Sequence, residues 1–193
     1  MSAAGADSRA VAVGVTGHRL LSGLEKVEAG VDEALRRIEQ AFPGRPLTVV
    51  SALAEGADRL VARRILERPG ARLLAPLPLP RSDYIADFAS AASKQEFLAL
   101  LERAAEIVEL PAPTVREQAY EAVGAYVLDR SQVLLTVWDG QGAQGRGGTG
   151  AVVARARARQ LPIAWVHAGN RKPGTLEPTT LGAEQGRVTF ENF

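Results

Sequence analysis

Glycine and threonine gather around residue 147 in a pattern suited to binding an anion. Gly147, Gly148 and Thr149 close a glycine-rich loop and stand before an alanine-rich run. The first N–H groups of a helix have no partner inside it and lie at the positive end of its dipole. Glycine has no Cβ and adopts positive φ, so such a backbone can wrap a phosphate, with the Thr149 hydroxyl as helix cap or ligand contact. Alternatively, the glycines only fill a surface loop.

A second group of candidates follows the first apolar run of the chain and consists of Gly17, His18 and Arg19. The Arg19 guanidinium could pair bidentately with a phosphate, and a strand end would hold it more rigidly than a loop holds Arg146. His18 could donate to a phosphate or act as a general base. Because no Asp or Glu can be assigned to orient its ring, the sequence favours simple hydrogen bonding.

The third group is the turn from Ser51 to Asp58, in which Ser51, Ala52, Glu55 and Gly56 are candidate ligand contacts. Asp58 and Glu55 could cap the next helix, whose positive end favours a carboxylate, or could bind a sugar. We expect capping for Asp58, whereas Glu55 is open to either role. Since like charges repel, neither carboxylate should touch a phosphate.

Asp139 and the remaining side chains allow two interpretations each. Asp139 before Gly140 is typical of a turn, and its carboxylate could equally accept hydrogen bonds from ribose hydroxyls. Tyr120 could stack on a base, although aromatic residues at helical spacing usually serve packing. Neither His18 nor His167 has a ligand-type neighbour three or four positions away, so we expect no metal site.

The surrounding sequence predicts the elements that would position these groups. Apolar β-branched runs predict strands, and apolar residues at helical spacing predict helices that end at Pro or Gly. The predicted strands are residues 11–15, 47–50, 71–77, 107–110, 133–138 and 162–166, with a terminal edge strand at 188–191. The predicted helices are residues 24–42, a segment from about 58 that ends before Pro69, and residues 96–105, 115–128 and 151–160.

Alternating strands and helices predict an α/β, Rossmann-like three-layer fold with a mainly parallel sheet and helices on both faces. Ligands of such sheets bind beyond the carboxyl ends of the strands. Each glycine-bearing turn follows a predicted strand, so the three turns should meet in one crevice. A length of 193 residues favours a single domain, with a disordered N-terminus over residues 1–10 and a loop-rich tail over 168–193.

Composition excludes several classes of protein. A net charge of +1 creates no strong field toward nucleic acid or membrane, and the absence of Cys excludes disulfides and thiolate chemistry. Residues 1–10 lack the apolar run of a signal peptide, and no stretch has the ~20 apolar residues of a membrane span, so we expect a cytoplasmic protein.

Two nucleotide-binding motifs are also disfavoured. Gly145, Gly147 and Gly150 have the spacing of the dinucleotide motif, but they lie far from their strand and no acidic residue follows about 20 positions later. This argues against a nicotinamide dehydrogenase. The loop also lacks the Lys-Ser/Thr pair of ATP-hydrolysing P-loops.

Taken together, the motifs resemble those of the SLOG superfamily. The resemblance rests on residues 14–19, residues 51–58 and the pairing of residues 138–140 with residues 147–149, and covers about Val11 to His167. That group includes the DNA-processing protein Smf/DprA, the LOG phosphoribohydrolases, also known as lysine decarboxylase-like proteins, and nucleotide-sensing domains of bacterial conflict systems. The resemblance implies a Rossmann-like fold that binds nucleotides, without a further cofactor.

One position departs from the LOG pattern. In a Gly-Gly-x-Gly-Thr-x-x-Glu motif aligned on Thr149, Val152 occupies the place of the Glu that is tied to cleavage of the N-glycosidic bond. A valine can neither accept a proton nor stabilise an oxocarbenium-like centre. The sequence therefore favours binding of a nucleotide or nucleotide-derived ligand by a sensor or regulatory domain. Such a sensor would need an effector protein in trans, and the LOG-type relatives imply a homodimer.

Two alternatives from other classes stay open. The first is an N-glycosidic hydrolase of nucleoside monophosphates that uses a different carboxylate, with Glu55 or Glu121 as candidates. The second is a single-stranded DNA-binding accessory protein. Such proteins combine basic grooves with stacking aromatics, and the balanced charge and 5% aromatic content give this alternative no support.

Overall fold

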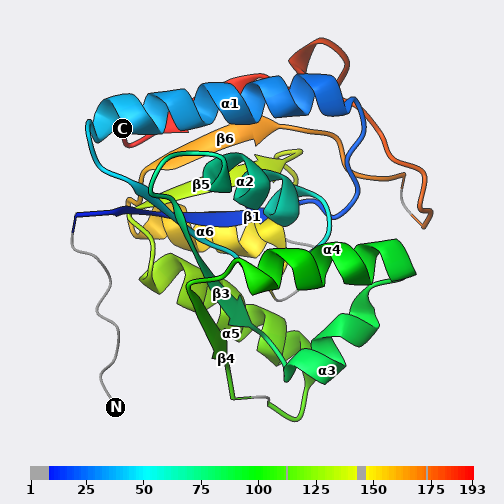
Figure 1. The fold of residues 1–193 in the computed structure, drawn as a ribbon. Helices are drawn as coiled ribbons and strands as arrows, with labels where there is room; N and C mark the ends of the chain where they lie inside the picture. Colours follow the sequence, from blue (N-terminus) through cyan, green and yellow to red (C-terminus); the bar gives the residue numbers. More distant parts are fainter. Residues whose placement is uncertain (1–8, 112, 143–146, 173) are drawn as a thin grey trace.

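The computed structural model describes residues 9–111, 113–142, 147–172 and 174–193 (Figure 1). Within these residues the strands are β1 (Val11–Gly17), β2 (Leu47–Val50), β3 (Arg72–Leu77), β4 (Glu106–Glu109), β5 (Val133–Trp138), β6 (Ile163–His167) and β7 (Val188–Glu191). They form one sheet in the order β4-β3-β2-β1-β5-β6-β7. Neighbours pair in parallel except β6 and β7, which are antiparallel. This arrangement confirms the predicted α/β fold with a mainly parallel sheet.

Helices cover both faces of this sheet, as the prediction required (Figure 1). The α-helices are α1 (Leu24–Ala41), α2 (Ala57–Leu66), α3 (Arg81–Tyr84), α4 (Ala91–Glu102), α5 (Arg116–Asp129) and α6 (Thr149–Ala158), joined by the 3₁₀ turns η1 (Ile85–Asp87) and η2 (Gly182–Glu184). α1 packs on β5, β6 and β7, and α2 packs on β1, β2 and β3. α5 and α6 contact each other and cover the other face along β1 and β5.

The central strand β5 shows why the sheet needs two layers of helices. All six of its residues are buried, and a strand exposes alternate side chains to opposite faces. Val133, Leu135 and Val137 belong to the main core with α1 and α2, while Leu134 and Trp138 pack with the buried side chains of α6. A continuous apolar run is therefore the expected signature of this strand.

The strand order changes direction between β1 and β5. The chain proceeds outward from β1 through β2 and β3 to β4, then returns to the other side of β1 to form β5, β6 and β7. The loops after β1 and β5 therefore run in opposite directions from the carboxyl edge of the sheet. Open α/β sheets bind ligands at such a point.

Most predicted boundaries agree with the structure to within a few residues, and two helices, α4 and α6, begin earlier than predicted. α4 starts at Ala91 rather than at residue 96, because the Ser90 hydroxyl accepts a hydrogen bond from the Ser93 N–H (3.0 Å) and caps the helix. α6 starts at Thr149 rather than at residue 151, which brings the first turn of the helix directly to the glycine pair.

The predictions for the two ends of the chain can be compared with the structure to different extents. The N-terminal segment predicted as disordered lies mostly outside the described residues, while the carbonyls of Arg9 and Ala10 accept hydrogen bonds from Arg45 (2.9 and 2.8 Å). The predicted edge strand of the tail is confirmed as β7. No helix in the described part of the chain is long and apolar enough to span a membrane.

Candidate functional site

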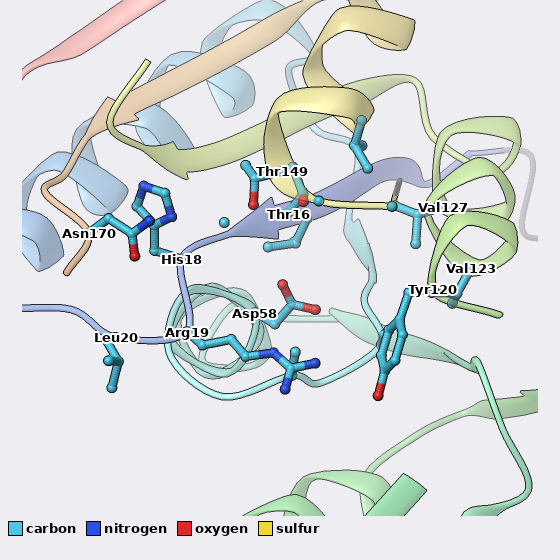
Figure 2. A pocket seen from close by; sticks show the side chains of 18 of the residues that line it. Thr16, His18, Arg19, Leu20, Asp58, Tyr120, Val123, Val127, Thr149 and Asn170 are labelled. Carbon is cyan, nitrogen blue, oxygen red and sulfur yellow. The ribbon is translucent and has the colours of Figure 1, made fainter. Parts of the chain in front are cut away.

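A crevice of about 430 Å³ opens at the carboxyl ends of β1 and β5, where the strand order reverses (Figure 2). All three glycine-bearing turns contribute to its walls, together with α5 and the start of the C-terminal tail. The lining consists of residues 15–20, Ala52, Ala54, Asp58, Tyr84, Glu117, Tyr120, Val123, Gly124, Val127, residues 147–149, Val152, Asn170 and Arg171. Its volume is within the range typical of small-molecule sites.

The glycine pair opens the first turn of α6 to this crevice. Gly147 has φ +81°, and a Cβ there would lie 2.8 Å from the backbone nitrogen of Glu121, so the site requires glycine. Gly148 is the N-cap with an ordinary φ of −76°, and a Cβ there would meet nothing within 4 Å. Thr149 follows the cap and lines the crevice instead of capping the helix. Arg146 lies outside the described residues.

His18 is held by a residue 121 positions away. Its Nε2 accepts a hydrogen bond from the backbone N–H of Asp139 (3.0 Å), and the Asp139 carboxylate lies 3.3 Å from the same nitrogen. Burial lowers the pKa of His18 despite the opposing effect of Asp139, so the ring is neutral at pH 7 and carries its proton on Nδ1. Asp139 thus orients the His18 ring through its backbone N–H, a contact that the sequence could not assign.

Asp139 itself does not line the crevice. Besides contacting His18, its carboxylate accepts a hydrogen bond from the backbone N–H of Gln141 (3.0 Å), which forms the Asx turn expected of this sequence. Asp139 therefore orients a lining residue, and the ribose contact considered for it from the sequence has no counterpart in the lining.

Arg19 extends along the lower wall in Figure 2, with its guanidinium between Asp58 and Tyr120. The guanidinium carbon lies 5.6 Å from the centroid of the Tyr120 ring. Its backbone is fixed by the second turn: the Ala57 N–H donates to the His18 carbonyl (3.0 Å), and a Cβ on Gly56 would lie 2.4 Å from the Arg19 carbonyl oxygen. Gly17 and Gly56 thus allow the close approach that positions Arg19.

The second turn has most of its polar groups paired within the protein. The Ser51 hydroxyl donates to the Asp58 carboxylate (2.9 Å) and accepts from the Leu53 N–H (3.0 Å). The Ser93 hydroxyl donates to the carboxylate of Glu55. Of the candidates in this turn, Ala52 lines the crevice, whereas Ser51, Glu55 and Gly56 do not.

Asp58 takes a different position from the one expected. Its carboxylate is not the helix cap, because it accepts hydrogen bonds from the Ser51 hydroxyl and the Ala54 N–H, both of which precede α2. It points into the crevice near Arg19 (Figure 2) and is 7% exposed. Burial raises the pKa of Asp58 to about 6, although the hydrogen bonds and two arginines counteract this effect. Such a shift is typical of functional carboxyl groups.

The wall opposite Asp58 is mainly apolar and comes from α5. Val123 and Val127 face the crevice near Tyr120, whose hydroxyl donates to the carboxylate of Asp87. Tyr84 is fully buried and contacts Tyr120 with ring centroids 6.4 Å apart. The helical spacing of α5 contained a signal for these valines, but nothing in the sequence connected Tyr84 or Asn170 with the site.

Two residues considered in connection with catalysis have clear positions. Glu121 forms an ion pair with Arg155 and does not line the crevice. Val152, at the position of the LOG glutamate, does line it. Among the described residues, no group of three or more His, Asp or Glu side chains is arranged to hold a metal ion.

Comparison with known proteins adds no identification. Neither a scan against protein-family models nor a search of curated proteins finds a match to this chain.

Proposed function

We propose that the crevice binds a nucleotide or nucleotide-derived ligand and that the protein is a sensor or regulatory domain of the SLOG type. The observation that carries this proposal is the open start of α6. Gly148 faces free space at a helix N-terminus, in a crevice that also contains the guanidinium of Arg19. Helix N-termini and arginine guanidinium groups both bind phosphate well in proteins.

In this proposal the phosphate accepts hydrogen bonds from the first N–H groups of α6. Arg19 supplies the counter-charge, and the neutral His18 donates from Nδ1. The separate contact of His18 Nε2 with the Asp139 N–H supports this assignment of the proton. The phosphate stays away from Asp58, whose carboxylate would repel it.

The nucleoside then occupies the rest of the crevice. Asp58 is suited to accept hydrogen bonds from ribose hydroxyls, because carboxylates serve this role in related folds. Val123, Val127 and Tyr120 offer an apolar wall for the base. Sites of this kind combine a mostly apolar lining with a few polar groups that fix the orientation of the ligand.

Thermal unfolding with a panel of ligands tests the proposal. The panel contains nucleoside monophosphates, cyclic nucleotides, NAD, ADP-ribose and a short DNA strand. A ligand at about 100 times its Kd should stabilise the protein by roughly 2.7 kcal/mol. Gly148→Asp should abolish the shift, because it adds a negative charge where the phosphate lies while its backbone conformation and open surroundings tolerate a side chain.

Gly142→Asp is the matched control. It adds the same charge in the loop that leads to α6, and a Cβ there also meets nothing within 4 Å. Retention of the ligand shift in this variant and its loss in Gly148→Asp would support a phosphate at α6. Equal behaviour of the two variants, or a shift by DNA alone, would contradict the proposal, and the latter would favour the DNA-binding alternative.

One observation favours a second candidate, hydrolysis of the N-glycosidic bond. Asp58 is a buried crevice carboxyl whose pKa is raised to about 6, whereas Glu55 and Glu121 lie outside the lining. When protonated, Asp58 would donate its proton to the departing base nitrogen as the bond to C1′ breaks. Water would add its hydroxyl group to C1′ and return the second proton to the carboxylate.

Chromatography of incubated nucleoside monophosphates separates the two candidates. A hydrolase releases free base and ribose 5-phosphate, and Asp58→Asn should lower this rate by at least about 100-fold while ligand binding remains. If a nucleotide that binds the protein is still intact after prolonged incubation, hydrolysis is excluded and the sensor proposal stands.

We also propose a cytoplasmic homodimer that signals to an effector protein in trans. The support is the resemblance to the LOG-type proteins and to nucleotide-sensing domains. Light scattering at several concentrations tests the assembly, and a monomeric mass throughout would contradict it.

A further inference from the structure

A second cavity of about 270 Å³ lies beside the crevice, between the start of α1, the outer face of α2 and α4. Arg19 and Leu20 line both spaces, so the two adjoin at these side chains. The remaining lining is Leu21, Leu24, Glu28, Gly56, Arg59, Leu60, Arg63 and Glu96. A ligand in the crevice can therefore continue past Arg19.

The lining of this second cavity carries one more positive than negative charge. Arg19, Arg59 and Arg63 provide the positive charges, and Glu28 and Glu96 the negative ones. Glu96 is shared by Arg59 and Arg63 of successive turns of α2. Among the described residues no carboxylate lies within ion-pair distance of Arg19, so its charge is available to a ligand.

Arg59 is the buried arginine of this lining. It is 1% exposed, and its Nη1 donates to the Ser93 carbonyl (2.9 Å) and to Glu96 (3.0 Å). Its guanidinium carbon lies 4.4 Å from the centroid of the Phe88 ring. Nη2 is buried and has no hydrogen-bond partner in the described part of the chain. Because buried donors normally have an acceptor, this N–H is free to bind an acceptor atom that enters the neighbouring cavity.

Glu28 lines the cavity, but its carboxylate already has a partner. Its carboxylate accepts a hydrogen bond from Nη2 of Arg64, at 3.0 Å. Arg64 follows Arg63 directly but does not line the cavity. The two adjacent arginines of α2 therefore differ in access to the same space.

We infer that the natural ligand is a nucleotide with a second phosphoryl group, which occupies this cavity between Arg19 and Arg63. The inference rests on the proposed nucleotide binding in the crevice. The first phosphate lies at α6 and Arg19 bridges both phosphates, as arginine does readily in bidentate contacts. Any group esterified to the second phosphate would contact the leucines of the lining, which are Leu20, Leu21, Leu24 and Leu60.

Isothermal titration with AMP, ADP and ADP-ribose tests this inference, with GMP and GDP as a second pair. The wild-type protein should bind the diphosphate of at least one pair about tenfold or more tightly than the monophosphate. Arg63→Ala should reduce that ratio to about threefold or less without changing affinity for the monophosphate. Glu96 keeps Arg59 as its partner in this variant, so the cavity wall remains neutralised.

Arg68→Ala, just beyond the end of α2, is the control and should retain the full preference for the diphosphate, because Arg68 pairs with Glu39 and neither residue lines the cavity. ADP-ribose distinguishes a free from an esterified second phosphate, since tighter binding than ADP indicates that the attached group is also held. Equal affinity for monophosphate and diphosphate, or an equal effect of the two arginine variants, would overturn the inference while the crevice proposal stands. Failure of every nucleotide to bind would overturn both.

Discussion

The turn from Ser51 to Asp58 and the loop that ends at Thr149 both contain glycine and both follow a strand of the sheet, but the protein uses them differently. In the first, the hydroxyl of Ser51 and the carboxylate of Glu55 have partners inside the protein. In the second, Gly148 faces open space at the start of α6. A glycine-bearing turn after a strand can thus either hold neighbouring segments in place or leave room for a ligand.

The two turns also use their glycines differently. Gly56 is required because it lies against the carbonyls of His18 and Arg19, whereas Gly148 has neither a positive φ nor a close neighbour. A glycine with no structural need beside a crevice suggests that a ligand needs the space. Substitutions in each turn should therefore separate loss of stability from loss of binding.

Gly56→Ala should have the largest effect on stability. Its φ of +76° disfavours any Cβ, and that Cβ would lie 2.4 Å from two carbonyl oxygens. Strain and overpacking together should cost on the order of 3 kcal/mol, seen as a fall of roughly 6–12 °C in the midpoint of thermal unfolding. A midpoint within about 2 °C of wild type would mean that the turn is not the rigid support described above.

Gly147→Ala and Gly148→Ala form the next comparison, within the open loop itself. Gly147→Ala should destabilise by about 1–2 kcal/mol because of its positive φ and the nearby backbone of α5. Gly148→Ala should change stability by less than about 0.5 kcal/mol, because alanine restricts the unfolded chain and fits the native conformation but is a poorer N-cap than glycine. Urea unfolding of both variants measures the difference, and equal destabilisation would contradict it.

Much of the fold could be predicted from the sequence because its signals are local. The central parallel strands are apolar runs, and Pro and Gly close several helices, so the strand limits agree with the structure to within two residues. The convergence of the three turns followed from the rule that parallel strands share one carboxyl edge. Ser90 caps α4 six residues before the predicted start of that helix, which apolar spacing alone could not reveal.

The parts of the site that escaped prediction depend on orientation and on distant contacts. A carboxylate in the first turn of α2 could face solvent or crevice, and only the packing against Ser51 and Ala54 turns Asp58 inward. His18 and Asp139 are 121 residues apart and meet because β1 and β5 are neighbours. Asn170 reaches the crevice from the tail, where no periodic pattern exists.

Asp58→Asn tests a residue of the second turn that is hydrogen-bonded within the protein and also lines the crevice. The folded pKa of about 6 exceeds the ordinary value of 3.8, so the folded state binds more protons than the unfolded state between these pH values. Stability from this group therefore falls as pH rises from about 4 to 6 and stays low above that range. Asparagine resembles the protonated form, so the variant should match wild type near pH 4 and exceed its stability at pH 7.5 by roughly 1–3 kcal/mol.

Unfolding midpoints of both proteins across this pH range give the difference directly. A variant less stable than wild type at pH 7.5 would contradict the prediction, because it would mean that Arg19 and Arg59 stabilise the ionised carboxylate more than burial opposes it.

Ser51→Ala should have the smallest effect on stability and should reveal how the supporting turn tunes the site. The substitution removes the hydrogen bond that the hydroxyl donates to Asp58, and it leaves the Leu53 N–H without its acceptor. The expected cost is about 1 kcal/mol. Because that hydrogen bond favours the ionised carboxylate, its loss should raise the pKa of Asp58 further above about 6. A carbon-13 NMR titration of the Asp58 carboxyl in both proteins measures the shift. A lower pKa in the variant would mean that water replaces the hydroxyl and that the crevice, not the turn, sets the protonation of Asp58.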